Sequence, residues 1–160
     1  MVIVSCDRTF DYRKLHIAFD AIWFHKRAIL IATNPDRFCP SPGGPGEPDC
    51  AAIVAGVEAS LRAQCQVAIG KPNPIMLQEA LGDLDVDLNK VVMTGDRLHT
   101  DIAMAVNAGV PSAMTLPGEG SREEILESPP ESRPTMVPDW VDKLLPRQIW
   151  EQNGWTKEPE

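Results

Sequence analysis

Short runs of β-branched residues alternate with segments of helical periodicity along most of the chain. The runs predict buried strands at Val2–Val4, Ala28–Ala32, Val67–Ile69, Val91–Met93 and Ser112–Leu116. The periodic segments predict helices at Asp11–Trp23, Ala51–Ala63, Pro72–Leu81, Thr100–Ala108 and Ser121–Leu126. A helix between two strands is the usual crossover of a parallel sheet. The sequence therefore predicts an α/β fold with largely parallel strands.

Charge and hydropathy exclude several classes of protein. The 160 residues carry a formal net charge of -8, which argues against binding nucleic acid or an anionic membrane through bulk electrostatics. No apolar run approaches the roughly 20 residues that a membrane span needs. The four cysteines are scattered without zinc-finger spacing, so we expect reduced structural thiols. A cytoplasmic protein is the expectation.

Proline marks the segments in which no regular element is expected. The stretch Pro40–Pro48 holds four prolines and three glycines and is predicted to be a loop. Ser128–Pro138 is predicted to be a linker, and the end of the chain from Arg147 a loosely held tail. The ordered body is therefore expected to end near Leu145.

The segment Val91–Ile102 carries the strongest chemical signal. Its strand delivers Gly95 and Asp96 to the carboxyl end of the sheet, where ligands of open α/β sheets bind. Asp101 follows in the first turn of the next helix. Two carboxylates on one loop suit Mg²⁺, which usually accepts only one or two protein carboxylates. The alternative is that Asp96 is a turn residue and Asp101 a helix-start acid.

Lys71 lies between a short strand and a helix, in the run Gly70-Lys71-Pro72-Asn73-Pro74. A lysine at a strand end beside a helix N-terminus can hold a phosphoryl group and offset its negative charge. Taken alone, Lys71 is better explained as an ordinary surface lysine.

Together these segments resemble motifs of a known enzyme family. Gly70-Lys71-Pro72 resembles the lysine motif of haloacid-dehalogenase (HAD) superfamily phosphatases, and Gly95–Ile102 resembles their acidic motif. The form Gly-Asp-Arg-Leu-x-Thr-Asp-Ile, with Ala32-Thr33-Asn34-Pro35-Asp36 upstream, is similar to the NagD-like or 4-nitrophenylphosphatase branch. Further matches are Asp7, Tyr12, Leu15, Pro42-Gly43-Gly44 and Pro138-Asp139-Trp140-Val141.

The resemblance implies a Mg²⁺-dependent hydrolysis of phosphate monoesters. In the family an Asp nucleophile forms an aspartyl-phosphate, and a second Asp two residues later acts as general acid and base. Lys71 is then expected to neutralise the phosphoryl charge, and Asp96 and Asp101 to bind the metal or support its shell. Asn34, Asp36 and Arg37 begin the loop that faces a small phosphorylated substrate in similar proteins; a plain turn is the alternative.

The resemblance also implies how the chain is divided. Residues 2–66 are expected to form a cap-like α/β unit, and residues 67–145 the carboxyl-terminal half of a Rossmann-like HAD core. Residues 146–160 are expected to be a tail. The opening Asp-x-Asp-Gly motif of the family is not found, so the chain appears from its sequence to begin at the cap.

Two passages have the outline of the missing motifs. Val2–Val4 leads into Ser5-Cys6-Asp7-Arg8, but Ser5 stands where the nucleophilic Asp should be and Arg8 where the Gly should be. Ile29–Ile31 leads into Thr33-Asn34, which has the outline of the Thr-Asn motif. Both passages align better with cap segments, so we interpret them as decoys.

Without the nucleophile strand, the strand before Asp96 is expected to have an open edge. Such an edge favours pairing with another chain, so a homo-oligomer is predicted. Three readings stay open at this point: a phosphatase, a non-catalytic HAD-derived module for metal binding or dimerisation, and an unrelated doubly wound domain. His99 lies in the acidic loop but is not expected to be catalytic.

Overall fold

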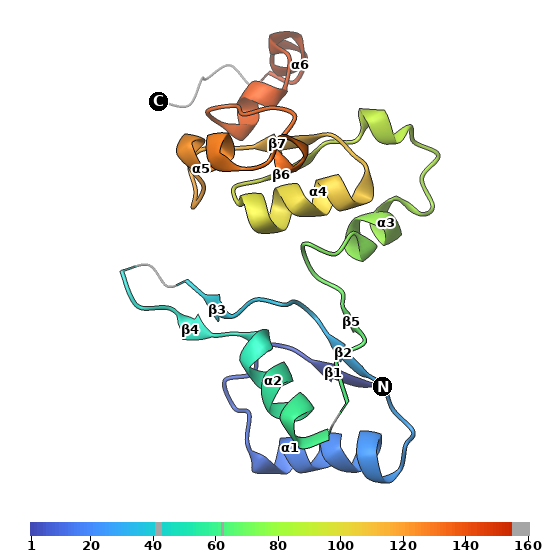
Figure 1. Ribbon diagram of the computed structural model, residues 1–160. Coiled ribbons are helices and arrows are strands. Elements are labelled where there is room, and N and C mark those ends of the chain that lie inside the picture. Colours follow the sequence, from blue (N-terminus) through green and yellow to red (C-terminus); the bar gives the residue numbers. More distant parts are fainter. Residues whose placement is uncertain (41–42, 62, 155–160) are drawn as a thin grey trace. The chain divides into compact units, whose positions relative to one another are not determined.

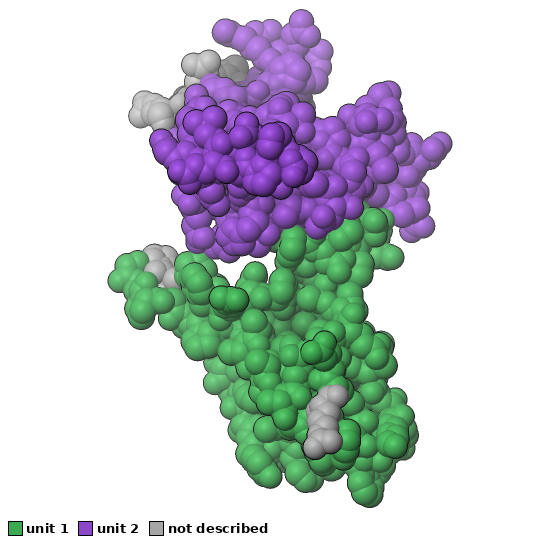
Figure 2. All heavy atoms as spheres, viewed as in Figure 1, with its two compact units in different colours: residues 1–79 green, residues 80–160 purple. Residues whose placement is uncertain are grey.

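The computed structural model describes residues 1–40, 43–61 and 63–154. They divide into two compact units, Met1–Glu79 and Ala80–Glu160, which Figure 2 colours separately. The division lies later in the chain than the predicted boundary between residues 66 and 67. The assignment of these parts to a cap and a core stays a prediction, and each unit is described by itself.

The first unit is a small parallel sheet with helices packed against it (Figure 1). Its elements are β1 (Val2–Val4), α1 (Tyr12–Phe19), β2 (Leu30–Ala32), β3 (Phe38–Cys39), β4 (Glu47–Pro48), α2 (Cys50–Leu61) and β5 (Val67–Ala68). Helix α3 (Ile75–Leu81) follows and crosses the division. The sheet order is β1-β2-β5 and both pairings are parallel, with Ile3 opposite Ile31 and Ile31 opposite Val67. The predicted α/β class with parallel strands is confirmed.

A single apolar cluster holds this unit together. Its buried members are Val4, Ala18, Leu30, Ala32, Cys50, Val57 and Leu61, from β1, β2, α1 and α2. Leu30 and Leu61 are almost fully buried, and each such side chain contributes roughly 2 kcal/mol when it leaves water. The cluster fixes β1 and β2 side by side, so that the residues after the two strands leave the sheet at the same edge.

Local chemistry sets the ends of α1. The Asp11 carboxylate accepts a hydrogen bond from the Lys14 amide, as its predicted N-cap role requires. After Phe19 the helix continues as one π-type turn, in which the His25 amide donates to the Asp20 carbonyl five residues back. The predicted helix Asp11–Trp23 is therefore present in two parts.

The proline-rich stretch is less irregular than predicted. Phe38–Cys39 and Glu47–Pro48 pair as the antiparallel strands β3 and β4, so the loop is the tip of a short hairpin. Pro48 is tolerated because the hairpin is a two-stranded edge, where a missing ladder donor costs little. Residues 41 and 42 of the predicted loop lie outside the described residues.

The second unit contains a two-stranded parallel sheet covered by short helices. Its elements are β6 (Met93–Gly95), α4 (Ala103–Ala108), β7 (Ser112–Met114), α5 (Arg122–Glu127) and α6 (Arg147–Gln152). Leu98–Ile102 forms a π-type turn that runs directly into α4, and 3-10 turns occupy Leu88–Lys90, Pro130–Ser132 and Val141–Leu144. The buried residues Ile102, Met114 and Ile125 form its central cluster.

Strand β7 lies between two neighbours. On one side it pairs with β6, with Met93 opposite Ser112 and Gly95 opposite Met114. On the other side Met114 donates its amide to the Met136 carbonyl, and Met136 donates its own to Ser112, both at 3.0 Å. The predicted linker Ser128–Pro138 thus contains one residue that extends the sheet.

One predicted strand in this unit is shifted, and two predicted helix ends are confirmed. The strand predicted at Val91–Met93 lies at Met93–Gly95, because the Val91 amide closes the preceding 3-10 turn on Leu88 and pairing begins at Met93. The predicted left-handed end at Gly109 is confirmed, with φ of 71°. The Ser121 hydroxyl caps α5 by accepting from the Glu124 amide, also as predicted.

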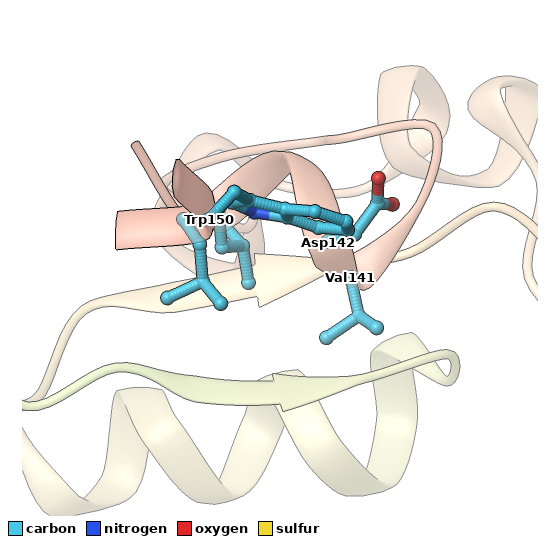
Figure 3. Close-up of a pocket in the computed structure, with 5 residues that line it drawn as sticks. Val141, Asp142 and Trp150 are labelled. Carbon is cyan, nitrogen blue, oxygen red and sulfur yellow. The ribbon is translucent and has the colours of Figure 1, made fainter. Parts of the chain in front are cut away.

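The end of the described chain folds back on itself. Val141, Asp142, Leu144, Leu145 and Trp150 line a mainly apolar pocket, in which Figure 3 places the Trp150 ring beside Asp142 and Val141. Trp150 is half-buried there. Residues 155–160 of the predicted tail lie outside the described residues. Within the part of the chain that is described, no helix has the length and apolar character of a membrane span.

Candidate metal and phosphate site

Asp96 is the first residue after β6. Its Oδ2 accepts a hydrogen bond of 3.1 Å from the Glu119 amide, and its carbonyl accepts one of 3.0 Å from the Gly120 amide. Both donors belong to the loop that follows β7. The carboxyl ends of the two parallel strands therefore meet at Asp96, as predicted for a ligand-binding edge.

Asp101 lies in the turn between β6 and α4 and is 4% exposed. Its Oδ2 accepts from the Arg97 amide at 3.3 Å and from the Thr100 hydroxyl at 3.5 Å. These bonds hold the carboxylate against the backbone of the segment that contains Asp96. The two acids belong to one short loop, and each accepts a hydrogen bond from a backbone amide.

Three glycines allow the backbone to approach the acids. A Cβ on Gly95 would collide with the Asp101 side chain, and one on Gly118 would collide with the Asp96 carboxylate. A Cβ on Gly120 would lie 2.6 Å from the Asp96 carbonyl oxygen. Larger residues would push the carboxylates away from the turn, so glycine is required for the observed packing.

The chemistry of this loop fits a hard divalent cation with few protein ligands. Among residues 1–40, 43–61 and 63–154, no group of three or more His, Cys, Asp or Glu side chains could hold a metal ion. Mg²⁺ needs no such group, because it keeps several waters or phosphate oxygens and takes one or two carboxylates. Asp96 and Asp101 are a donor set of that kind.

Lys71 belongs to the first unit, where it follows β5. The preceding residue, Gly70, donates its amide to the Thr33 carbonyl at 2.7 Å, and a Cβ there would lie 3.0 Å from Cβ of Asn34. The structure thus places Lys71 and Asn34 on adjacent loops at the carboxyl ends of β5 and β2. Lys71 is exposed at this edge.

The remaining predicted substrate residues lie on the strand-to-hairpin connection after β2. The Asn34 side chain accepts from the Asp36 amide at 2.9 Å, which forms an Asx turn. The Asp36 and Arg37 carbonyls accept from the Ala51 and Asp49 amides, so the start of α2 holds this connection in place. The Asx turn agrees with the alternative of a structural role for Asn34, whereas Arg37 is exposed.

Comparisons with known proteins agree with this geometry. Residues 68–144 match the family model described as HAD-hydrolase-like. Glycerol-3-phosphate phosphatase of Gallus gallus is 32% identical over 89% of this chain and 47% of its own. Ribonucleotide monophosphatase NagD of Escherichia coli is 31% identical over 88% of this chain and 51% of its own. The crystal structure of 4-nitrophenylphosphatase from Thermotoga maritima superposes with a TM-score of 0.77 and 34% identity, covering 89% of this chain and 53% of that one.

The chain belongs to the HAD superfamily, in its NagD-like branch. The resemblance of the two sequence motifs is therefore confirmed at the level of the family. The chain spans about half the length of the relatives it matches.

Asp7, in the passage that has the outline of the HAD nucleophile motif, is held by its own neighbours. Lys14 Nζ lies 2.6 Å from Oδ2 of Asp7, and the Thr9 hydroxyl and amide donate to Oδ1 at 2.7 and 2.8 Å. The hydrogen bond from Lys14 and those from Thr9 lower the pKa of Asp7 to about 2. A carboxylate bound in this way closes a loop, and the decoy interpretation of this passage stays a prediction.

The loop Gly118–Glu119–Gly120 was missed by the sequence reasoning. It contributes the amide that orients Asp96, yet it lies more than twenty residues away in the sequence. The pattern Gly-x-Gly directly beyond a predicted strand is a signal for close backbone approach, and it could have indicated this loop.

Proposed function

We propose that this chain provides the metal-binding and phosphate-binding half of a phosphate monoester hydrolase. The observation that carries the proposal is that Asp96 and Asp101 lie in one loop after β6 and that each packs against a glycine. Family membership and the phosphatase names of the relatives support the reaction class. The substrate class is a small phosphorylated compound.

In this proposal Asp96 and Asp101 hold Mg²⁺. When bound, the ion supplies positive charge that neutralises and orients a phosphoryl group. The protein contributes two carboxylates whose orientation is fixed by amides and a hydroxyl before any cation arrives. Pre-orientation of this kind lowers the cost of binding, because the ligands need not be ordered at that moment.

Lys71 is proposed to bind the phosphoryl oxygens through its ammonium group. Its exposure and its place beside Asn34 at the carboxyl ends of β2 and β5 support contact with a ligand. Asn34, Asp36 and Arg37 are proposed to shape the substrate side of the same edge. Arg37 is the member of this set that offers a cation for a second anionic group of the substrate.

The experiment that tests the proposal combines metal binding with turnover. Mg²⁺ is titrated into the full chain by calorimetry, and 4-nitrophenyl phosphate hydrolysis is followed with and without Mg²⁺. Asp96→Ala is expected to abolish Mg²⁺ binding, and Asp85→Ala, which removes an exposed acid of the same unit, is the matched control. Absence of both binding and turnover in the unaltered chain contradicts the proposal.

The same experiment distinguishes the enzyme from a non-catalytic module. Turnover that disappears in Asp96→Ala supports a phosphatase. Mg²⁺ binding without turnover supports a HAD-derived binding or dimerisation module. Weaker binding of inorganic phosphate by Lys71→Gln, with binding by Lys90→Gln unchanged, would assign the phosphate contact to Lys71.

We also propose that the chain associates with a second copy through the outer edge of β6. Met93 donates its amide to Pro111 and Gly95 accepts from Thr115, so both residues face β7. In a parallel ladder the residue between them faces the opposite way, and Thr94 is exposed. Light scattering coupled to size-exclusion chromatography tests this: Thr94→Pro, which removes a ladder donor, is expected to shift a dimer to monomer. A monomer before substitution contradicts the proposal.

A further inference from the structure

Arg97 and Glu119 form an ion pair beside the two candidate metal carboxylates. Nη2 of Arg97 lies 2.6 Å from Oε1 of Glu119. The Arg97 side chain is 25% exposed and that of Glu119 48% exposed. A guanidinium that is largely covered loses less to water and salt than a fully exposed cation, so this pair is expected to be stronger than an average surface pair.

Each partner of this pair also holds one of the acids through its backbone. The Arg97 amide donates to Asp101 at 3.3 Å, and the Glu119 amide donates to Asp96 at 3.1 Å. The ion pair therefore connects the two residues whose amides orient the two carboxylates. It joins the loop after β6 to the loop after β7, which are 22 residues apart in sequence.

We infer that Arg97 and Glu119 are positioning residues that fix the spacing of Asp96 and Asp101 for a divalent cation. This inference rests on the proposed metal site. The backbone bonds from Thr115 to Gly95 and from Gly120 to Asp96 anchor the base of the second loop. Glu119, the residue before Gly120, is held by its amide on Asp96 and by its side chain on Arg97.

The pair has a second consequence for the charge of the site. Glu119 is a third acid in these two loops, and the Arg97 guanidinium neutralises its carboxylate at contact distance. The local charge that a cation meets is then that of two acids, which suits Mg²⁺ with its remaining positions on water or phosphate. Without Arg97, Glu119 is a competing ligand on a loosened loop.

The test measures Mg²⁺ affinity of the full chain by calorimetry. The variants are Glu119→Gln, Arg97→Gln and the exchange Arg97→Glu with Glu119→Arg; all keep both backbone amides and both candidate ligands. Loss of a residue that orients a metal ligand typically costs 10–100-fold in affinity. We expect each single variant to raise the dissociation constant about tenfold, and the exchange to restore part of the loss. Arg122→Gln breaks the more exposed pair with Asp139 and is the matched control.

A second readout needs no metal. Amide hydrogen exchange of Glu119 and Arg97 in the metal-free chain is expected to accelerate at least several-fold in the single variants, while the amides of Thr115 and Gly120 are unchanged. Unaltered exchange together with Mg²⁺ affinities within twofold of the unaltered chain overturns the inference. If the unaltered chain binds no Mg²⁺, the proposed function fails, and exchange rates alone then decide whether Arg97 and Glu119 position the loops.

Discussion

Two aspartates follow strands of parallel sheets in this protein, one in each unit, and their surroundings differ. Asp7 follows β1 and meets the ammonium group of Lys14 at 2.6 Å as well as two donors from Thr9. Asp96 follows β6, and its carboxylate accepts a hydrogen bond from the Glu119 amide, 23 residues away in the sequence. Within the described residues, no ion pair reaches Asp96.

The difference explains why a strand that ends in an acid does not by itself make a metal site. An ammonium group compensates the charge of a carboxylate at contact distance. This interaction is stronger than a hydrogen bond from a neutral amide. The lowered pKa of Asp7, about 2, records that compensation. Asp96 is oriented without being neutralised, and this is what a metal ligand requires.

The largest predicted effect tests the glycine packing that distinguishes the second unit. Gly95→Ala places a Cβ against the buried Asp101 side chain, and overpacking of this kind costs about 3 kcal/mol. Gly56→Ala is the control in the first unit: its Cβ meets open space within α2, and alanine is the better helix former by about 1 kcal/mol. Urea unfolding followed through amide resonances of each unit measures both changes. A Gly95→Ala chain of unaltered stability would mean that Asp101 does not pack on this turn.

The features that could be predicted from sequence are those decided by neighbours in the chain. The caps at Asp11 and Ser121 depend on an amide three residues on, and the left-handed residue Gly109 on the absence of its own Cβ. Asp96 and Asp101 are in one loop because only four residues of one segment lie between them. For the same reason, the acidic half of the candidate site could be predicted.

The features that were missed depend on segments distant in sequence. Pairing with β7 decides where β6 begins. The strand therefore starts two residues later than predicted. The hairpin β3–β4 and the bridge from Ala113 to Met136 likewise need partners that no local pattern names. Glu119 belongs to this group, because its role follows from contact with Arg97.

A smaller effect is predicted in the first unit, where a substitution can make the surroundings of Asp7 more like those of Asp96. Lys14→Gln removes the largest cause of the low pKa of Asp7, so the titration midpoint of that carboxyl should rise from about 2 toward the ordinary 3.8. The folded-state pKa is depressed, so the stability that Asp7 contributes is present above about pH 4 and lost as the pH falls toward 2. In Lys14→Gln, the part of the folding stability that is lost at low pH should therefore be smaller. Carboxyl NMR titration measures the midpoint, and an unchanged value contradicts the assigned role of Lys14.

The smallest effect is expected for Thr9→Ala, which removes one hydroxyl from the same carboxylate. The Thr9 amide still donates to Oδ1 of Asp7, and Lys14 still donates to Oδ2, so the positive charge and two donors stay in place. The pKa of Asp7 should therefore rise less than in Lys14→Gln, because a neutral donor stabilises an anion less than an ammonium group does. The same NMR titration ranks the two variants. A larger rise in Thr9→Ala would reverse the ranking and show that orientation, not charge, separates Asp7 from Asp96.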